Sequence, residues 1–301
     1  MSPNQALIVK FKNDISYNVD LSKYNWFNLG GPAEYLFKPI NEKQLINFLV
    51  INKKNKFKIT ILGAGSNTLV RDKGVSGVVI KLGSGFSKIN LIDEDILEVG
   101  AATLDRKVSN FAKENGIGKL EFLSCIPGTL GGAVVMNSGC YNNDISKVLI
   151  SLRAIDINEC VEKEIPREKI NFFYRGCDLD KNLIITSVKL KGIKGKIEEI
   201  EKKQKELIEK KKLSQPSQIK TCGSTFKNLN GEKKVWQIIK ETGCDEYKEG
   251  DAFISKKHCN FFVNKGNAKS ADIEKLINRV KRTVEEKTGV NLELEIKIIG
   301  D

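Results

Sequence analysis

Histidine is almost absent from this chain, since His258 is the only one among 301 residues. A catalytic triad, a His-rich metal site and most general-base schemes built on imidazole are therefore disfavoured. The seven cysteines are odd in number and widely spaced, and no two of them form a C-x-x-C pair. This spacing supports neither a disulfide framework nor a zinc site. We expect reduced, mostly buried thiols and no protein-bound metal.

Long apolar runs are missing as well. No segment of the sequence approaches the roughly 20 consecutive apolar residues that a membrane-spanning helix needs. The first five residues contain neither a basic region nor an apolar export segment. We therefore expect a cytoplasmic protein without a membrane partner, and the length favours two domains.

The net charge of +12 raises the possibility of a nucleic-acid partner. The lysines, however, are spread along the whole chain and alternate with acidic residues, as in 202–206. No dense basic arm with interleaved aromatic residues is present, so we expect no nucleic-acid partner. A positive field would equally attract anionic nucleotides.

Two glycine loops are the most informative segments. The first, 61–67, directly follows an apolar run, and the second, 126–133, is followed by the polar segment 137–141. Glycine lets the main chain approach a ligand closely, so that N–H groups can converge on phosphate oxygens. Neither loop ends in the Lys-Ser/Thr pair of a P-loop, and Gly63-Ala64-Gly65 lacks the third glycine of the dinucleotide fingerprint. Each loop alone could be an ordinary turn, whereas together they suggest a bipartite cradle for a pyrophosphate.

Hydrophobic periodicity predicts an α+β fold. In the first part of the chain it favours strands at 33–37, 58–61, 78–81, 96–99, 149–156 and 183–190, with helices around 45–49 and over 104–115. A highly charged helix over 196–212 is typical of a solvated connector and predicts a domain boundary. Beyond it we expect a helix at 235–242, a strand at 260–263, a helix with Ser270 as its N-cap, and a half-buried strand at 292–299.

Three side chains stand out as candidates for chemistry. Arg175 follows an aromatic trio, and its guanidinium could bind a carboxylate through two hydrogen bonds, although it could also simply pack on the aromatic rings. Ser224 follows a glycine and could donate a proton, although a serine here could equally belong to a turn. Glu295 lies on the polar face of the last predicted strand, where a surface carboxylate is the simpler interpretation.

Seven ordered segments together resemble the UDP-N-acetylenolpyruvoylglucosamine reductase family, and their spacing is similar to the shorter of its two forms. The resemblance runs nearly the full length of the chain, through 28–33, 62–67, 126–141, 174–175, 223–228, 255–261 and 292–300. It implies a vanillyl-alcohol-oxidase/PCMH-type flavin fold. An FAD-binding domain would occupy 1–195, with subdomains of about 1–83 and 84–195, followed by the helical connector 196–212 and a smaller α+β substrate-binding domain at 213–301.

The resemblance also implies a function in peptidoglycan synthesis. NADPH would reduce non-covalently bound FAD, and the UDP-sugar enolpyruvyl ether would then be reduced to UDP-N-acetylmuramate by a monomeric enzyme. Arg175 and Glu295 match the residues that stabilise the enolate, and Ser224 matches the proton donor. Substrate-binding positions match Tyr174, Lys212 and Asn228. The FAD-binding positions match Gly63, Gly65, Ser66, Asn67, Pro127, Gly128, Thr129, Gly131, Gly132, Asn137, Gly139 and Tyr141.

The chain departs from the family pattern at several positions. Where the flavin loop normally reads Asn-Ala-Gly-Ala-Tyr-Gly, this chain has Cys140 at the second alanine and Asn142 at the last glycine, and Cys177 replaces a serine after Tyr174-Arg175.

Two alternatives remain open at this point. One is another flavin oxidoreductase of the same fold, and the other is a non-catalytic basic protein that binds nucleotides or nucleic acid.

Overall fold

The computed structural model describes all residues except 1–9, 12 and 230–232. By compactness the chain divides into two units. The first comprises the described residues up to Ser16 together with Leu36–Ala64 and Val78–Lys211, and the second comprises Tyr17–Tyr35, Gly65–Gly77 and Lys212–Asp301. Helices and strands alternate in both units.

A five-stranded antiparallel sheet forms the centre of the first unit, in the order β12-β11-β15-β7-β6. The fully buried side chains of Leu97, Val99 and Val188 pack with those of α3 and α4 in one apolar core. The strands are β6 (Ile89–Asp93), β7 (Ile96–Gly100), β11 (Leu149–Asp156), β12 (Glu162–Pro166) and β15 (Leu183–Lys191), and the helices are α3 (Asp105–Glu114), α4 (Leu130–Val135) and α5 (Ile197–Ser214).

A second, four-stranded sheet has the order β1-β2-β5-β3, and the boundaries between the two units fall within its first three strands. Helix α2 (Glu42–Asn55) follows β2, and the ring of its Phe48 stacks on Phe37 with centroids 4.3 Å apart. The Asn41 side chain caps this helix by accepting from the N–H of Gln44. The strands are β1 (Ile15–Asp20), β2 (Pro32–Phe37), β3 (Ile59–Ile61) and β5 (Val75–Ile80).

Three short antiparallel pairs complete the strands of the first unit. β9 (Gly139–Cys140) pairs with β10 (Asn143–Asp144), β13 (Phe172–Phe173) with β14 (Gly176–Cys177), and β8 (Ile117–Gly118) with β16 (Ile193–Lys194). The first two pairs are tight hairpins that contain residues of the predicted site.

The second unit has a separate apolar core. Phe27, Leu29 and Leu69 pack there with side chains from far along the sequence, including those of α7. The elements are β4 (Thr68–Val70), which pairs in parallel with β20 (Lys297–Ile299), the three-stranded sheet of β17 (Lys248–Glu249), β18 (Ala252–Ile254) and β19 (Phe262–Asn264), and the helices α6 (Val235–Glu241) and α7 (Ser270–Thr288).

Most predicted elements have a counterpart in the structure, with two corrections at the C-terminal end. Ser270 is the first residue of α7 and not its N-cap, because its hydroxyl donates to the carbonyl of Val70 and Lys269 precedes the helix. The predicted strand at 292–299 is regular only over β20, since Leu294 instead forms an isolated bridge with Phe226.

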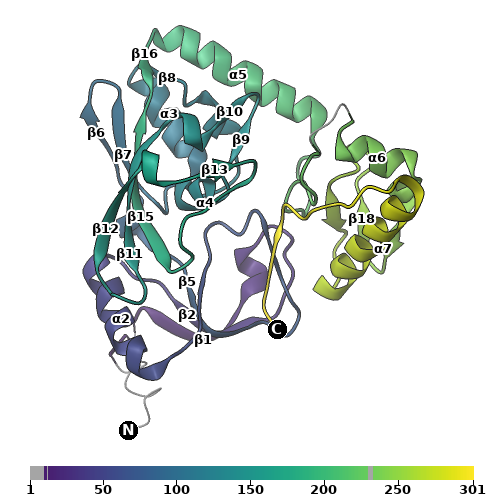
Figure 1. Cartoon of the computed structure of the whole chain (residues 1–301), viewed down its shortest axis with the longest axis horizontal. Coiled ribbons are helices and arrows are strands. Elements are labelled where there is room, and N and C mark those ends of the chain that lie inside the picture. The colour runs from purple at the N-terminus through teal and green to yellow at the C-terminus, as the bar shows by residue number, and fades with distance from the viewer. Residues whose placement is uncertain (1–9, 12, 230–232) are drawn as a thin grey trace. The chain divides into compact units, whose positions relative to one another are not determined.

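The compact units differ from the contiguous domains that we expected. Residues 17–35 and 65–77 group with the C-terminal part of the chain because their apolar side chains share its core. Helix α5, the long green helix of Figure 1, belongs to the first unit almost to its end, and its buried Gln204 donates to Ser109 of α3 at 3.0 Å. The assignment of FAD and substrate binding to particular domains stays a prediction.

None of the helices in the described part of the chain combines the length and the hydropathy that crossing a bilayer would require. The described residues also contain no cluster of three or more His, Cys, Asp or Glu side chains arranged to hold a metal ion.

Candidate active site

The first glycine loop offers main-chain donors. Within the described residues, no protein acceptor receives the N–H groups of 63–67. The carbonyl of Gly63 accepts a hydrogen bond from the ammonium of Lys81, which follows β5 directly. Burial lowers the pKa of Lys81. Consecutive unbonded N–H groups beside a half-buried lysine form an environment that suits phosphate oxygens.

The second glycine loop is held by main-chain contacts. Gly131 donates its N–H to the carbonyl of Ala101 at 2.9 Å, and Gly128 accepts at 3.1 Å from the N–H of Asp105. A Cβ at Gly131 would lie 3.0 Å from the Cβ of Ala101, so the loop is closely packed on this side. Helix α4 begins immediately after Thr129, and the N–H groups of its first two residues, Leu130 and Gly131, donate to the carbonyls of Thr103 and Ala101 at 2.9 Å each.

The two loops meet at Thr129. A Cβ added to Gly63 would lie 2.7 Å from the Thr129 hydroxyl oxygen, and a Cβ added to Gly132 would lie 3.6 Å from the same atom. Three residues of the predicted FAD set, one from the first loop and two from the second, therefore surround one small space in the first unit. The bare N–H groups and the absence of β-carbons in this space fit a pyrophosphate.

The rest of the first loop is anchored within the second unit. Gly65 accepts a hydrogen bond from the N–H of Trp26 at 3.1 Å and has φ +66°, a left-handed conformation that favours glycine. The Asn67 side chain donates to the carbonyl of Glu295 at 3.0 Å. Ser66 lies between these two residues and is partly exposed.

Arg175 lies in a cleft of about 310 Å³ within the first unit. Its Nη2 donates to the carbonyl of Gly139 at 3.0 Å, and its guanidinium carbon is 4.8 Å from the centre of the Tyr174 ring. The Asn137 side chain also lines this cleft and donates to the carbonyl of Phe173 at 3.1 Å. The structure thus brings the predicted enolate-binding arginine together with part of the predicted flavin-binding segment.

The backbone around Arg175 is strained. Arg175 sits in the turn of the β13–β14 hairpin with φ +58°, a region that non-glycine residues rarely occupy. Asn137 and Tyr141 have positive φ as well, at +40° and +51°. Strain of about 1–3 kcal/mol per residue is typical of positions where geometry serves binding or catalysis.

Ser224 and Glu295 lie on neighbouring segments of the second unit. The N–H of Glu295 donates to the carbonyl of Thr225, the residue after Ser224, at 2.8 Å. Ser224 itself forms a bridge with Phe261 after Gly223, whose φ is +81°. Arg175 belongs to the first unit, so the convergence of all three side chains stays a prediction.

The two predicted diphosphate ligands have structural contacts of their own. The side-chain oxygen of Asn228 accepts at 3.2 Å from the N–H of Val235 at the start of α6. The exposed Lys212 accepts at its carbonyl a hydrogen bond of 2.6 Å from Lys257. The contact of Asn228 does not use its amide nitrogen.

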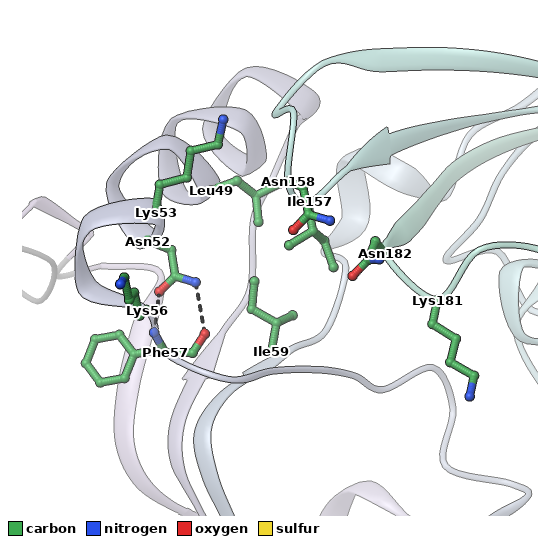
Figure 2. A pocket seen from close by; sticks show the side chains of 10 residues that line it. All are labelled: Leu49, Asn52, Lys53, Lys56, Phe57, Ile59, Ile157, Asn158, Lys181 and Asn182. Carbon is green, nitrogen blue, oxygen red and sulfur yellow. Dashed lines mark hydrogen bonds between the residues drawn. The ribbon is translucent and has the colours of Figure 1, made fainter.

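A larger cleft of about 710 Å³ lies elsewhere in the first unit and contains none of the predicted site residues (Figure 2). The amide of Asn52 there is occupied by two hydrogen bonds with the backbone of Phe57. Figure 2 shows Lys53 and Lys181 pointing in opposite directions, so their charges do not converge on one ligand. We therefore place the candidate active site at the glycine loops.

Two lysines that contact the loops were not among the predicted site residues. Besides Lys81, Lys211 donates from its Nζ to the carbonyl of Cys125 at 2.7 Å, and burial lowers its pKa. Lys81 could have been found because it ends a predicted strand close to the first loop. Lys211 could not have been found from the sequence, because one lysine in a highly charged helix is indistinguishable from the lysines around it.

Comparison with known proteins identifies the family. The model of the UDP-N-acetylenolpyruvoylglucosamine reductase C-terminal domain matches residues 215–299, and an FAD binding domain model matches 33–161. A UDP-N-acetylenolpyruvoylglucosamine reductase of Pelagibacter ubique is 51% identical over 97% of this chain and 98% of its own length. The chain belongs to the UDP-N-acetylenolpyruvoylglucosamine reductase family.

Further similarities agree with this assignment. The corresponding protein of Rickettsia bellii is 43% identical over 97% of this chain and 95% of its own length. The crystal structure of the reductase from Thermus caldophilus superposes with a TM-score of 0.82 at 31% identity, covering 95% of this chain and 98% of that one. The predicted family, the α+β fold class and FAD as the cofactor are thereby confirmed.

Proposed function

We propose that this chain uses NADPH and bound FAD to reduce the enolpyruvyl ether of UDP-N-acetylglucosamine to UDP-N-acetylmuramate, in the synthesis of peptidoglycan. The observation that carries the proposal is the 51% identity to a named reductase over 97% of the chain. The meeting of the two glycine loops at Thr129 supports it independently. FAD, when bound, supplies hydride transfer from NADPH to the vinyl group of the substrate.

The protein's own residues would bind FAD and orient the substrate. The N–H groups of 63–67 and of the loop at Thr129 would hold the pyrophosphate of FAD. Asn137, Gly139 and Tyr141 would lie along the flavin. Because Arg175 already contacts the carbonyl of Gly139, a substrate carboxylate bound to its guanidinium would lie beside this segment.

Three side chains would act on the charge that develops in the substrate. Hydride addition to the vinyl carbon distal to the carboxylate creates an enolate, which Arg175 and Glu295 would stabilise and orient. Preorganised groups of this kind contribute roughly 3–4 kcal/mol each. Ser224 would donate the proton to the carbon bearing the carboxylate. Tyr174, Lys212 and Asn228 would bind the substrate, the last two at its diphosphate.

We further propose that the protein acts as a cytoplasmic monomer without a nucleic-acid or membrane partner. The absence of a nucleic-acid partner is supported by the dispersed lysines, since they form no dense basic arm. A positive field around the protein would favour the approach of two anionic reactants, NADPH and the UDP-sugar. Sedimentation analysis of the purified enzyme tests the monomer directly.

An anaerobic two-step titration tests the reaction. Purified protein should be yellow, NADPH alone should bleach the flavin absorbance, and the enolpyruvyl nucleotide should then restore it with formation of UDP-N-acetylmuramate. A colourless protein that takes up no FAD, or a bleached protein that only oxygen re-oxidises, would contradict the proposal. The second result would favour another flavin oxidoreductase of the same fold.

A further inference from the structure

Lys81 is a half-buried cation at the first glycine loop, and the proposed function gives it no role. β3 and β5 are parallel neighbours in their sheet, so the glycine loop after β3 and Lys81 after β5 leave the same edge. The main-chain N–H of Lys81 donates to the carbonyl of Phe37 at 3.0 Å, which fixes the start of the side chain at the sheet. The ammonium donates to the carbonyl of Gly63. The sheet therefore holds this cation against the loop.

No carboxylate balances the charge of Lys81 in the described part of the chain. Its ammonium has three N–H groups, and the carbonyl of Gly63 is its one acceptor among the described residues, so two N–H groups stay available to a ligand. Burial and, to a smaller extent, the charge of Lys38 lower the pKa of Lys81. Taking a cation out of water without a counter-ion is unfavourable, and a bound anion would offset this effect.

The first glycine loop has donors but no charge of its own. The N–H groups of 63–67 lack protein acceptors within the described residues, and Thr129 of the second loop lies beside Gly63. Such N–H groups can donate to phosphate oxygens, but they cannot neutralise the negative charge of a diphosphate. The segment 61–67 contains neither lysine nor arginine. Lys81 brings a positive charge to this loop from the neighbouring strand.

We propose that Lys81 is a binding residue for the diphosphate of FAD, to which it supplies the positive charge that the first glycine loop lacks. This role rests on the proposed function, because it takes the glycine loops as the diphosphate site. Lysine binds phosphate as a point charge on a flexible stem, so the ammonium can keep the carbonyl of Gly63 and reach a phosphate oxygen with a second N–H group. The diphosphate then provides the counter-ion that the described side chains do not.

Three substitutions separate the charge of Lys81 from its contact with Gly63. K81M removes the charge and the donor, whereas K81Q keeps a donor for the carbonyl of Gly63 without a charge. We expect the Kd for FAD to rise on the order of 10–100-fold in both variants, as is typical for the loss of a charged hydrogen bond. K81R should recover most of the affinity, because arginine also carries a positive charge that binds phosphate.

Equilibrium dialysis of the FAD-loaded, full-length protein measures these Kd values at low and at high salt. Because the contribution of Lys81 is electrostatic, the difference between the wild type and K81M should shrink as the salt concentration rises. K58M is the matched control, since Lys58 is exposed, directly precedes β3 and has the same charge. Its Kd should equal that of the wild type. Circular dichroism shows whether each variant is folded, and K81Q and K81R decide the question if K81M is not.

Several results would overturn the proposal. K81M could bind FAD as tightly as the wild type, or K58M could lose as much affinity as K81M. Wild-type affinity in K81Q alone, or a loss in K81M that salt does not change, would mean that Lys81 only braces the loop. A wild type that binds no FAD would refute the proposed function as well, whereas tight FAD binding that K81M leaves unchanged refutes only the role of Lys81.

Discussion

Replacing Asp105 by asparagine should stabilise the folded protein at neutral pH. Asp105 is the first residue of α3 and is fully buried in the first unit. Within the described residues, neither oxygen of its carboxyl group has a hydrogen-bond partner, and the same is true of the nearby Thr103 hydroxyl. Burial without a partner raises the pKa of Asp105 well above its usual value, because it disfavours the charged carboxylate relative to the neutral acid.

The sign of the effect follows from proton linkage. The folded pKa of Asp105 is raised, so between the unfolded pKa of about 3.9 and the folded pKa the native state binds the extra proton. The contribution of Asp105 to the free energy of unfolding is therefore complete below about pH 4. This contribution is lost as the pH rises from the unfolded pKa through the folded pKa. The loss is at most about 1.4 kcal/mol per pH unit, which limits it to about 4 kcal/mol at pH 7.

Asparagine has nearly the same shape and no proton to lose, so it removes this pH-dependent loss. A carboxylate in the first turn of a helix gains about 0.3–1 kcal/mol from the helix dipole, which is smaller than the desolvation that opposes it. We expect D105N to be about 1–4 kcal/mol more stable than the wild type at pH 7 and nearly equal to it at pH 4.

Urea unfolding followed by circular dichroism at a fixed excess of FAD, repeated from pH 4 to 8, measures this difference. D156N is the control of opposite sign, because Lys163 and the N–H groups of two neighbouring residues lower the pKa of Asp156. Its stabilising contribution is present above the unfolded pKa and is lost as pH falls through the folded pKa. A D105N advantage that does not grow with pH, or a less stable D105N, would refute the reasoning.

Three further predictions concern the candidate site. G63A should weaken FAD binding by about tenfold in a fluorescence titration, because the new Cβ would lie 2.7 Å from the Thr129 hydroxyl oxygen. If G63A costs the same in a T129A background, this steric explanation is wrong. R175K should slow substrate reduction by about 10²–10³-fold in stopped-flow measurements, since lysine lacks the forked guanidinium. NADPH should still reduce the flavin, and a slower flavin reduction would count against the proposed role of Arg175. S224A should also keep flavin reduction and nearly abolish substrate reduction, and equal loss of both half-reactions would reject Ser224 as the proton donor.

Local patterns predicted the elements whose residues are close in sequence. The apolar stripe of Ile273, Leu276 and Val280 predicted α7, and the αL glycine at 289 ends it as expected. Helix α3 was predicted in the same way, with Gly116 in the left-handed region just beyond it. In each case the periodicity and the capping residue lie within one segment, so the sequence alone contains the needed information.

Features that depend on distant partners were not predictable. β4 pairs with β20 although more than two hundred residues separate them, and this pairing decides where the final strand becomes regular. Phe27 and Leu69 pack in the core formed by C-terminal residues. Hydrophobic periodicity within one segment cannot predict such a contact. The division of the chain into discontinuous units follows from these contacts.

The candidate site shows the same contrast. The glycine loops were found by composition, and their meeting at Thr129 agrees with the predicted cradle. The contacts of Lys81 with Gly63 and of Lys211 with Cys125 were not anticipated, because each joins a side chain to the carbonyl of a residue far from it in the sequence.

The two glycine loops also differ in how they are prepared for a ligand. The second loop is fixed on three sides: Ala101 accepts from Gly131, Asp105 donates to Gly128, and Lys211 donates to Cys125. The first loop instead leaves its N–H groups without protein acceptors in the described structure. Its carbonyls are held nevertheless, since Gly63 accepts from Lys81 and Gly65 accepts from Trp26, so the first loop has ordered contacts while its donors stay available to a ligand. Changes at the contacts of the second loop should therefore appear mainly as lost protein stability, while changes that obstruct the N–H groups of the first loop should appear mainly as lost affinity for FAD.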